Sequence, residues 1–429
     1  MHPNVWHPFT SIKSTLDPLK VTSGDGILLT LEDGKEIIDC ISSWWVNIHG
    51  HSHPEISKAI SEQAQKLEHV IFSNFTHQSA EDVATELALL LPGNLNKVFF
   101  SDNGSTAVEV ALKVAIQHWQ NKGEKRQKFI AFEGGYHGDT FGAMSAGSRT
   151  IFSDVFSSHL FDVDFVDYPS TWEGDTSVGE KEDAVIEKIE QLLSDSPDEY
   201  AGIIIEPLVQ GAGGMNMCRE EFLQKLHWVN RQYDTLLIFD EVMTGFGRTG
   251  EFFACKKAQV QPDIICLAKG LTGGFLPLSV TVCTDEIYES FNSDDPLKTF
   301  WHGHSYTANP LGCAAAVASL KILKESEKRI QSFEAVHRKQ MKRFEKYSDV
   351  KKIRYKGTIV AFDLETDQAD GYLNPVSNTL KKHCVEYGLL IRPLGNTIYL
   401  MLPYCVTDEE LETVYSRLEN LLVEKLSIS

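Results

Sequence analysis

Two apolar stretches, Leu236-Leu237-Ile238-Phe239-Asp240 and Ile264-Ile265-Cys266-Leu267-Ala268-Lys269, decide how this chain folds. Neither alternates apolar with polar residues, as a half-exposed strand does, so each is typical of a strand buried on both faces of a sheet. Each stretch ends in a charged residue. Because open α/β sheets bind ligands at the carboxyl ends of their strands, Asp240 and Lys269 are predicted to lie in one binding site.

Helices and strands alternate along the chain around these two stretches. Additional strands are expected at residues 98–100, 129–132, 202–205 and 278–283, and helices at 54–69, 79–91 and 106–120. Short apolar strands separated by helices predict a largely parallel sheet that is covered on both faces.

The two ends of the chain have a different pattern. Apolar residues 27–31 and 37–41 flank Asp33-Gly34, a favoured hairpin turn. Near the C-terminus, strands at 359–364, 389–392 and 397–401 precede a helix that Thr407 and Glu410 begin with a capping box. We expect an arm and part of a small domain in 1–53, a large domain in 54–309, and the C-terminal part of the small α+β domain in 310–429.

Composition narrows the possible partners. The 429 residues carry 60 acidic and 40 basic side chains, a net charge of −20. An acidic surface repels phosphate backbones and anionic lipids, so we expect neither nucleic acid nor a membrane as partner. The eight cysteines form no C-x-x-C pair and several interrupt apolar runs. Together with an N-terminus that lacks the features of a signal peptide, they indicate reduced thiols in the cytoplasm.

The pair formed by Asp240 and Lys269 has a specific chemical use. A partly buried lysine has a lowered pKa and can form a Schiff base with an aldehyde. A buried aspartate nearby can hold a protonated pyridine nitrogen, which is the arrangement that pyridoxal phosphate requires. The alternative is a buried ion pair that closes two strands, and the spacing alone does not favour either interpretation.

The segment Ser101-Asp102-Asn103-Gly104-Ser105-Thr106 follows a strand and begins a helix. Thr106 and Glu109 fit a capping box, and Gly104 permits close approach of the backbone. Unpaired amides at a helix start bind phosphate well. By itself, a helix cap without ligand is the commoner explanation.

Two other motifs suggest cofactors but lack the required context. Residues 245–250 match G-x-G-x-x-G, the nicotinamide fingerprint, yet no strand directly precedes them and no clear helix follows. His49, His51 and His53 could converge on a metal only in an extended segment, and no Cys, Asp or Glu lies nearby to complete the set. We therefore expect a turn-rich loop and no metal.

Taken together, the segments resemble the class III, fold-type I pyridoxal phosphate aminotransferases nearly from end to end. The residues that carry the resemblance are Ile205-Glu206-Pro207, Phe239-Asp240-Glu241-Val242, Gly245 to Gly250, Ala268-Lys269-Gly270 and Thr272-Gly273-Gly274. The resemblance implies a mostly parallel seven-stranded sheet in a large domain, a smaller α+β domain built from both termini, and pyridoxal 5′-phosphate as cofactor.

Within this family the chain is most similar to the branch that converts 8-amino-7-oxononanoate to 7,8-diaminononanoate in biotin biosynthesis. The distinguishing segments are Trp6 to Thr10, Ser42-Ser43-Trp44-Trp45, Gly135 to Thr140, Gln210 to Met215 and Ile391 to Gly395. Three alternatives remain: lysine as amino donor, another ω-amino acid as substrate, or a nicotinamide dehydrogenase that uses residues 245–250.

The resemblance assigns roles at the cofactor. Lys269 would bind it covalently and move the proton, Asp240 would keep its ring nitrogen protonated, and Tyr136 would stack on the ring. The amides of Gly104 and Ser105 would hold the phosphate.

The same resemblance implies a homodimer with active sites at the subunit interface. Ser305, beside His304, would reach the phosphate from the partner subunit. Phe9, Trp44, Tyr136 and Gly303 would line the substrate channel, Arg392 would pair with the substrate carboxylate, and Glu206 and Arg248 would support the site.

Two departures from the family bear on the amino donor. Phe9 stands where many members have a tyrosine, and His304-Ser305 stands where Pro-Thr is common. Part of the family uses lysine in place of S-adenosylmethionine. We expect S-adenosylmethionine, because Trp44 offers a flat face to an adenine or a sulfonium.

Overall fold

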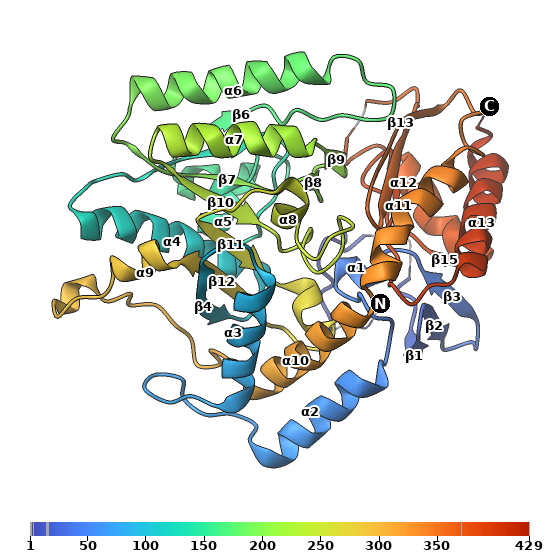
Figure 1. Ribbon diagram of the computed structural model, residues 1–429. Helices are drawn as coiled ribbons and strands as arrows, with labels where there is room; N and C mark the ends of the chain where they lie inside the picture. The colour runs from blue at the N-terminus through green and yellow to red at the C-terminus, as the bar shows by residue number, and fades with distance from the viewer. Residues whose placement is uncertain (1, 3, 14–16, 370, 429) are drawn as a thin grey trace.

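The structure is a computed structural model that describes residues 2, 4–13, 17–369 and 371–428. Its centre is a seven-stranded sheet (Figure 1). In spatial order the strands are β4 (Leu95–Ser101), β12 (Ser279–Thr284), β11 (Ile264–Leu267), β10 (Leu236–Asp240), β7 (Tyr200–Ile205), β5 (Lys128–Phe132) and β6 (Asp164–Val166). Only β12 runs against its neighbours, so the expected mostly parallel seven-stranded sheet is confirmed.

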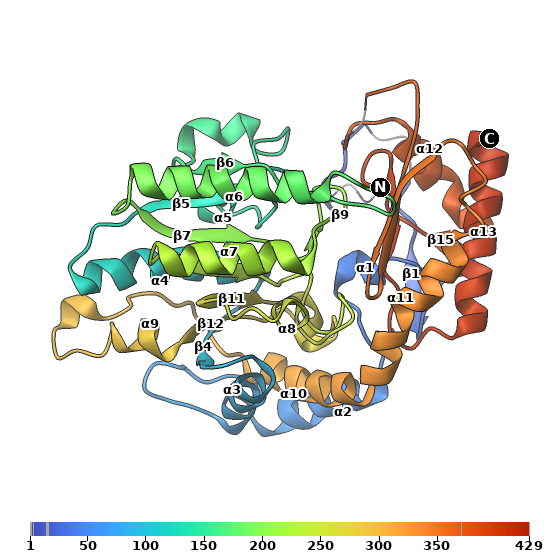
Figure 2. The ribbon, with the colours of Figure 1, turned by 45° about the horizontal axis from the view of Figure 1, so that its top comes forward.

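Helices cover both faces of this sheet, which explains why its strands lack alternation. On one face α4 (Gly104–Lys122) and α5 (Phe141–Ala146) share a core with Ile204 of β7. On the other, α6 (Val178–Asp195) and α7 (Glu220–Gln232) share a core with Ile203. Figure 2 shows α6 and α7 lying together along one side of the sheet.

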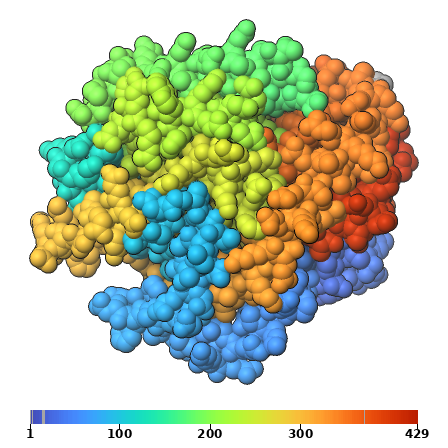
Figure 3. Space-filling view, viewed as in Figure 1, coloured from blue at the N-terminus to red at the C-terminus, as the bar shows by residue number. Residues whose placement is uncertain are grey.

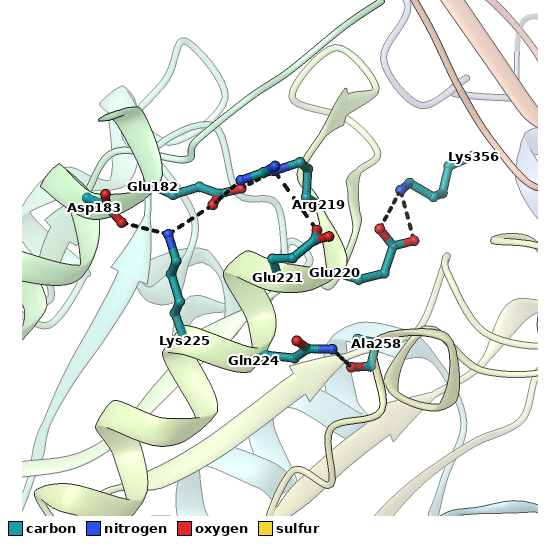
Figure 4. A network of polar contacts seen from close by, with 9 residues as sticks. All are labelled: Glu182, Asp183, Arg219, Glu220, Glu221, Gln224, Lys225, Ala258 and Lys356. Carbon is teal, nitrogen blue, oxygen red and sulfur yellow. Dashed lines mark hydrogen bonds and ion pairs between the residues drawn. The ribbon is translucent and has the colours of Figure 1, made fainter. Parts of the chain in front are cut away.

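Ion pairs join these two helices to their surroundings (Figure 4). Glu182 of α6 is fully buried and accepts two hydrogen bonds of 2.7 Å from Arg219, which precedes α7. Lys225 bridges Glu182 at 3.2 Å. Lys356, from the other part of the molecule, contacts Glu220 at 3.1 Å. Two basic partners compensate the buried Glu182 carboxylate. These ion pairs hold α6 and α7 together on one face of the sheet.

A smaller α+β part is built from both ends of the chain, as expected. Strands β1 (Val21–Asp25), β2 (Leu28–Leu31) and β3 (Glu36–Asp39) form one sheet with β15 (Leu389–Leu390), which is parallel to β3. A second sheet contains β13 (Val350–Lys356), β14 (Ile359–Leu364) and β16 (Thr397–Leu400). Figure 3 shows the N-terminal segment (dark blue) lying against the C-terminal segment (red).

Three helices pack together beneath the large sheet, and three others belong to the smaller part. Helix α10 (Pro310–Glu325) packs on α2 (Pro54–Lys66) and α3 (Gln78–Leu90) beneath the large sheet (Figure 1). The helices of the smaller part are α11 (Glu327–Met341), α12 (Val376–His383) and α13 (Asp408–Leu426). Helix α13 begins with the predicted capping box of Thr407 and Glu410.

The other elements are short. They are α1 (Ser42–Trp45), α8 (Ala254–Ala258), α9 (Asp285–Glu289), β8 (Val209–Gln210), β9 (Asn216–Met217), and the 3-10 turns η1 (Asp154–His159), η2 (Lys269–Thr272), η3 (Pro296–Lys298) and η4 (Cys384–Tyr387).

Sequence patterns missed five strands: β1, β6, β8, β9 and β13. Strands β8 and β9 have two residues each, and β1 contains one apolar residue. Strand β6 has three residues and β13 is rich in lysine and arginine, so neither presents an apolar run. All eight cysteines are free. Within the described ranges, no helix combines the length and the apolar character that crossing a membrane requires.

Candidate active site

Asp240 and Lys269 line one cavity of about 830 Å³ at the carboxyl edge of the large sheet. Strand β10 ends at Asp240, which is paired in parallel register with Cys266 of β11. Lys269 follows β11 after one intervening residue and has a left-handed φ of 43°. The parallel register therefore brings the carboxylate and the amine into the same cavity, as the strand ends predict.

Among the residues that the structure describes, the amine of Lys269 is not engaged in an ion pair. Its Nζ lies 4.9 Å from the centre of the Trp45 ring, and it forms no hydrogen bond or ion pair with the rest of the described chain. Burial lowers its pKa, although Asp240 and Glu206 act in the opposite direction. The alternative of an ion pair closing two strands is therefore wrong. A lysine with a lowered pKa is more often neutral and can attack a carbonyl carbon.

Asp240 is instead bound to His137, which sequence reasoning did not single out. His137 Nδ1 lies 2.7 Å from Asp240 Oδ2, and both side chains are almost fully buried. Burial alone lowers the pKa of His137, but the hydrogen bond and charge of Asp240 outweigh it and raise the pKa. The backbone amide of Val242 donates to Asp240 Oδ1 at 3.0 Å. The only sequence signal for His137 was its position next to Tyr136.

Glu206 fixes the backbone around the cavity. Its two carboxylate oxygens accept hydrogen bonds of 2.9 Å from the amides of Tyr136 and Gly211. Burial raises the pKa of Glu206 to about 7. Glu206 thus joins two loops that follow different strands, and it positions the Tyr136 ring at the cavity.

The start of α4 is capped differently from the prediction. Asn103 accepts a hydrogen bond from the amide of Thr106 and its own amide donates to the Thr106 hydroxyl, so the capping box is Asn103 with Thr106. The predicted box of Thr106 with Glu109 is wrong because the helix begins two residues earlier. Glu109 instead accepts from the amides of Gly142 and Ala143.

This helix start meets the requirement for holding a phosphate. The amides of Gly104 and Ser105 are in the first turn, where N–H groups have no helical partner, and both residues line the cavity. A Cβ at Gly104 would lie 2.6 Å from Val242, so the backbone approach requires glycine. The Ser105 hydroxyl is bonded to Thr140 at 2.7 Å, which leaves the amides as the available donors.

The opposite wall of the cavity comes from a left-handed turn. Ser42, Ser43, Trp44 and Trp45 have φ angles of 49°, 45°, 71° and 76° in succession. Each such residue costs about 1–2 kcal/mol relative to the right-handed conformation. Both tryptophans of this turn line the cavity. Backbone strain of this kind persists only where surrounding contacts compensate it.

Hydrogen bonds of five side chains supply those contacts. Asp39, fully buried, accepts from the Ser43 hydroxyl at 2.7 Å and from His51 Nε2 at 3.0 Å. The Ser42 hydroxyl donates to the Met401 carbonyl at 2.7 Å. Arg248, also buried, donates to the carbonyl of Trp45 at 3.1 Å.

A cation and two aromatic rings complete this wall. The Arg392 guanidinium lies 4.5 Å from the centre of the Trp44 ring, and Phe9 meets that ring edge-on at 5.4 Å. No carboxylate in the described ranges pairs with Arg392. An unpaired guanidinium at a cavity is suited to bind a carboxylate bidentately.

The cavity contains most of the site residues that the sequence predicted, but not all. Phe9, Trp44, Gly104, Ser105, Tyr136, Asp240, Lys269 and Arg392 line it. Gly303, His304 and Ser305 do not; they belong to a largely exposed loop. Arg248 lies beneath the wall and supports Trp45. Asp139, which accepts from the Tyr136 hydroxyl at 3.0 Å, lines the cavity and was missed by sequence reasoning.

The two other cofactor motifs have structural explanations. Residues 245–250 form buried turns in which Gly247 has a φ of 101° and Arg248 is buried, so no nucleotide can reach them and the nicotinamide alternative is wrong. His51 is bound to Asp39, a partner that the sequence analysis did not recognise. No cluster suited to a metal ion occurs among the residues described.

Comparisons with known proteins agree with this geometry. Residues 11–422 match the family described as "Aminotransferase class-III". A protein of Synechococcus elongatus, named adenosylmethionine-8-amino-7-oxononanoate aminotransferase, is 55% identical over 423 residues, 99% of each chain. A protein of the same name from Anoxybacillus flavithermus is 38% identical over 98% of this chain and 95% of its own.

Solved structures have the same fold. The enzyme of that name from Methanocaldococcus jannaschii superimposes with a TM-score of 0.91 at 33% identity, covering 98% of this chain and 97% of its own. A PLP-bound amine transaminase from an uncultivated Pseudomonas species gives 0.91 at 30% identity, with 99% of each chain covered.

The chain belongs to the class-III aminotransferase family. Within that family it groups with the proteins named adenosylmethionine-8-amino-7-oxononanoate aminotransferase.

Proposed function

We propose that this protein transfers an amino group from S-adenosylmethionine to the ketone of 8-amino-7-oxononanoate and makes 7,8-diaminononanoate, a step of biotin biosynthesis. The observation that carries the proposal is one cavity with the Lys269 amine at one wall and the Arg392 guanidinium at the other, neither of them paired with a carboxylate of the described chain. The Lys269 amine is suited to transamination, and the Arg392 guanidinium is suited to bind the carboxylate of an acid with a long chain.

The residues present fit pyridoxal 5′-phosphate. The amides of Gly104 and Ser105 would bind its phosphate, Asp240 its ring nitrogen, Tyr136 its ring face and Lys269 its aldehyde carbon. When bound, the cofactor supplies an electron sink that stabilises negative charge on the substrate carbon. Asp240 would hold a positive ring nitrogen because its carboxylate lines the cavity and a hydrogen bond with His137 stabilises the charged form.

Lys269 moves the proton. Burial lowers its pKa, which favours the neutral Nζ, and a neutral Nζ can take a proton from one substrate carbon and deliver a proton to the other reacting carbon. Trp45 lies over this Nζ, where an aromatic face still stabilises the protonated amine. The lysine therefore works as base and acid without a carboxylate partner.

The substrates bind in turn at the opposite wall. Arg392 pairs with the carboxylate of the oxo acid, and Trp44 and Phe9 exclude water along its methylene chain. The donor leaves its amino group before the acceptor enters, so one cavity serves both half-reactions.

The active unit is a homodimer, with Gly303, His304 and Ser305 reaching the cofactor site of a second copy. The exposure of Gly303 and Ser305 and the position of all three residues outside their own cavity support this arrangement. Mixing inactive Lys269→Ala and Ser305→Ala subunits should restore activity, because one site of each heterodimer is intact. No recovery after proven subunit exchange contradicts the shared site.

We further propose a cytoplasmic location and a division into a large domain at 54–309 with a small domain formed by 1–53 and 310–429. The eight free cysteines support the location. The sheet formed by β1, β2, β3 and β15 supports the joint small domain.

The half-reactions test the donor. With the purified holoenzyme, S-adenosylmethionine should convert the cofactor to its aminated form faster than lysine at equal concentration, and 8-amino-7-oxononanoate should reverse the conversion. Faster conversion by lysine contradicts the donor. Turnover of 4-aminobutyrate or β-alanine without turnover of the oxononanoate contradicts the acceptor; the similarity to an amine transaminase makes this the relevant second candidate.

A further inference from the structure

A second cavity of about 740 Å³ opens beside the active-site cavity. Tyr136, Asp139, Phe152, Tyr372 and Leu394 are among the residues that line both. The two cavities are therefore neighbouring compartments of one cleft between the large sheet and the smaller part of the molecule. The roles proposed above use only the first compartment.

A row of aromatic rings leads from the first compartment to the second. Phe9 packs on Trp44 at 5.4 Å and on Phe152 at 5.9 Å, and Phe152 meets Tyr372 edge-on at 4.8 Å. The guanidinium of Arg392 already covers one face of Trp44. Tyr372, which is half-buried, is the ring of this row that lines the second compartment together with Phe152.

The loop that carries Tyr372 is fixed to the turn that follows Arg392. The amide of Gly371 donates to Asn396 Oδ1 at 3.1 Å. Gly395 has a φ of 63°, and a Cβ there would overlap the Gly371 carbonyl. The loop of Tyr372 is thus held to the segment that follows Arg392 by one hydrogen bond to a side chain and by close approach of the Gly395 backbone.

The charges of the cleft suit a particular ligand. In the second compartment Arg354 and Asp363 neutralise each other at 2.8 Å, and Thr397 also donates to Asp363. Lys352 also lines this compartment, 3.9 Å from Asp363, and Asp139 adds a second carboxylate, so two cations stand beside two carboxylates. The described lining is therefore polar but nearly neutral, which does not favour a charged chain. In the shared wall, Asp139 presents a carboxylate. A negative group at this boundary favours a cation between the two compartments.

We propose that the second compartment binds the adenosyl group of the amino donor, with the purine against the ring of Tyr372. S-adenosylmethionine has an amino-acid part, a positive sulfur and a neutral, flat purine in succession. The cleft presents Lys269 in the first compartment only, and Asp139 and the Tyr372 ring at the boundary with the second. Lysine has no group for the second compartment. The inference rests on the proposed donor and adds the location of its purine.

Binding of 5′-methylthioadenosine tests the subsite without turnover, because this compound contains the purine and ribose but no amino group to transfer. Binding to the holoenzyme is measured by titration calorimetry. Tyr372→Ala should weaken it about 5- to 150-fold, the range for a base stacked on an aromatic side chain. Tyr372→Phe, which keeps the ring, should bind within about twofold of the wild type. Tyr288→Ala removes an exposed tyrosine on α9 and is the matched control.

The two half-reactions of Tyr372→Ala give the second readout. The second-order rate constant with S-adenosylmethionine should fall by the same factor, while that with 8-amino-7-oxononanoate stays within about twofold, since the acceptor has no purine. A purely structural role for Tyr372 reduces both half-reactions equally.

Several outcomes overturn the subsite. They are equal loss in both half-reactions, unchanged binding of 5′-methylthioadenosine in Tyr372→Ala, and no binding of it to the wild type. If the wild type uses S-adenosylmethionine and Tyr372→Ala behaves normally, only the subsite is wrong. If the wild type takes amino groups from lysine alone, the proposed donor fails together with the subsite.

Discussion

The two walls of the active-site cavity are built in opposite ways. The cofactor wall consists of strand ends and a capped helix start: Asp240 after β10, Lys269 after β11 and Gly104 at α4. The substrate wall consists of a left-handed turn at Ser42–Trp45, the arm residue Phe9 and the turn at Arg392, which come from both ends of the chain.

The difference between the two walls separates the residues that react with the cofactor from the residues that select the substrate. Groups that react with the cofactor need fixed positions, and a sheet that is covered on both faces supplies them. Groups that select the substrate are carried by loops, which can change without disturbing that sheet. Substitutions in the cofactor wall should therefore slow both half-reactions, whereas substitutions in the substrate wall should mainly slow the reaction with the acceptor.

Lys269→Ala should have the largest effect and is confined to the cofactor wall. An alanine methyl can neither bind an aldehyde carbon nor move a proton, so both half-reactions should slow by many orders of magnitude while the fold survives. Rapid-mixing kinetics measures the rates and circular dichroism checks the fold. Near-normal turnover refutes the role of Lys269.

Asp240→Asn should have the second largest effect. An amide cannot stabilise a positive ring nitrogen, and we expect a loss of at least ~10³-fold in both half-reactions, by analogy with other lost electrostatic groups. A loss below tenfold contradicts the assignment. Asp285→Asn, which changes a surface carboxylate paired with Lys97, is the matched control and should retain full activity.

The walls should also differ in how pH affects stability. Burial raises the pKa of Glu241, next to Asp240, to about 7. The folded chain then holds a proton that the unfolded chain releases above its usual 4.5, so stability falls as pH rises from 4.5 to 7, by up to about 3 kcal/mol. Urea unfolding at several pH values should show this slope reduced in Glu241→Gln; an unchanged slope contradicts the prediction.

Asp39, which supports the substrate wall, should change stability with pH in the opposite direction. Burial raises its pKa, but hydrogen bonds from His51 and Ser43 outweigh this and lower it below 3.8. Its contribution to stability is therefore present above pH 3.8 and is lost as pH falls through the lowered pKa of the folded state.

Arg392→Lys should affect only the substrate wall. Lysine keeps the charge but cannot bind a carboxylate bidentately. The rate constant with 8-amino-7-oxononanoate should fall about 10- to 100-fold through weaker binding, the range for hydrogen bonds between charged groups. The absorbance of bound cofactor should be unchanged. An altered spectrum would place Arg392 at the cofactor.

The smallest expected effect concerns the strain in the left-handed turn. Ser43→Ala loses the hydrogen bond to Asp39 and should slow the acceptor half-reaction about fivefold, the value of one hydrogen bond. Ser43→Gly loses the same bond but adopts a φ of 45° without strain, so it should be closer to the wild type. If glycine is as damaging as alanine, the hydroxyl acts by another route.

The sequence by itself determined the sheet and the cofactor wall. The runs before Asp240 and Lys269 are apolar without alternation, which requires burial on both faces, and parallel strands bring their carboxyl ends to one edge. The helix start near Gly104 could also be predicted from neighbouring residues, although the residue that caps the helix is Asn103 and not the predicted Thr106.

Only the tertiary structure decided what surrounds these groups. The contact of His137 with Asp240, the support of Trp45 by Arg248 and the row from Trp44 to Tyr372 all join residues far apart in the chain. Local patterns report the period of an element and its ends. They carry no information on which distant side chain compensates a buried charge or a strained turn, because that depends on packing between the two parts of the fold.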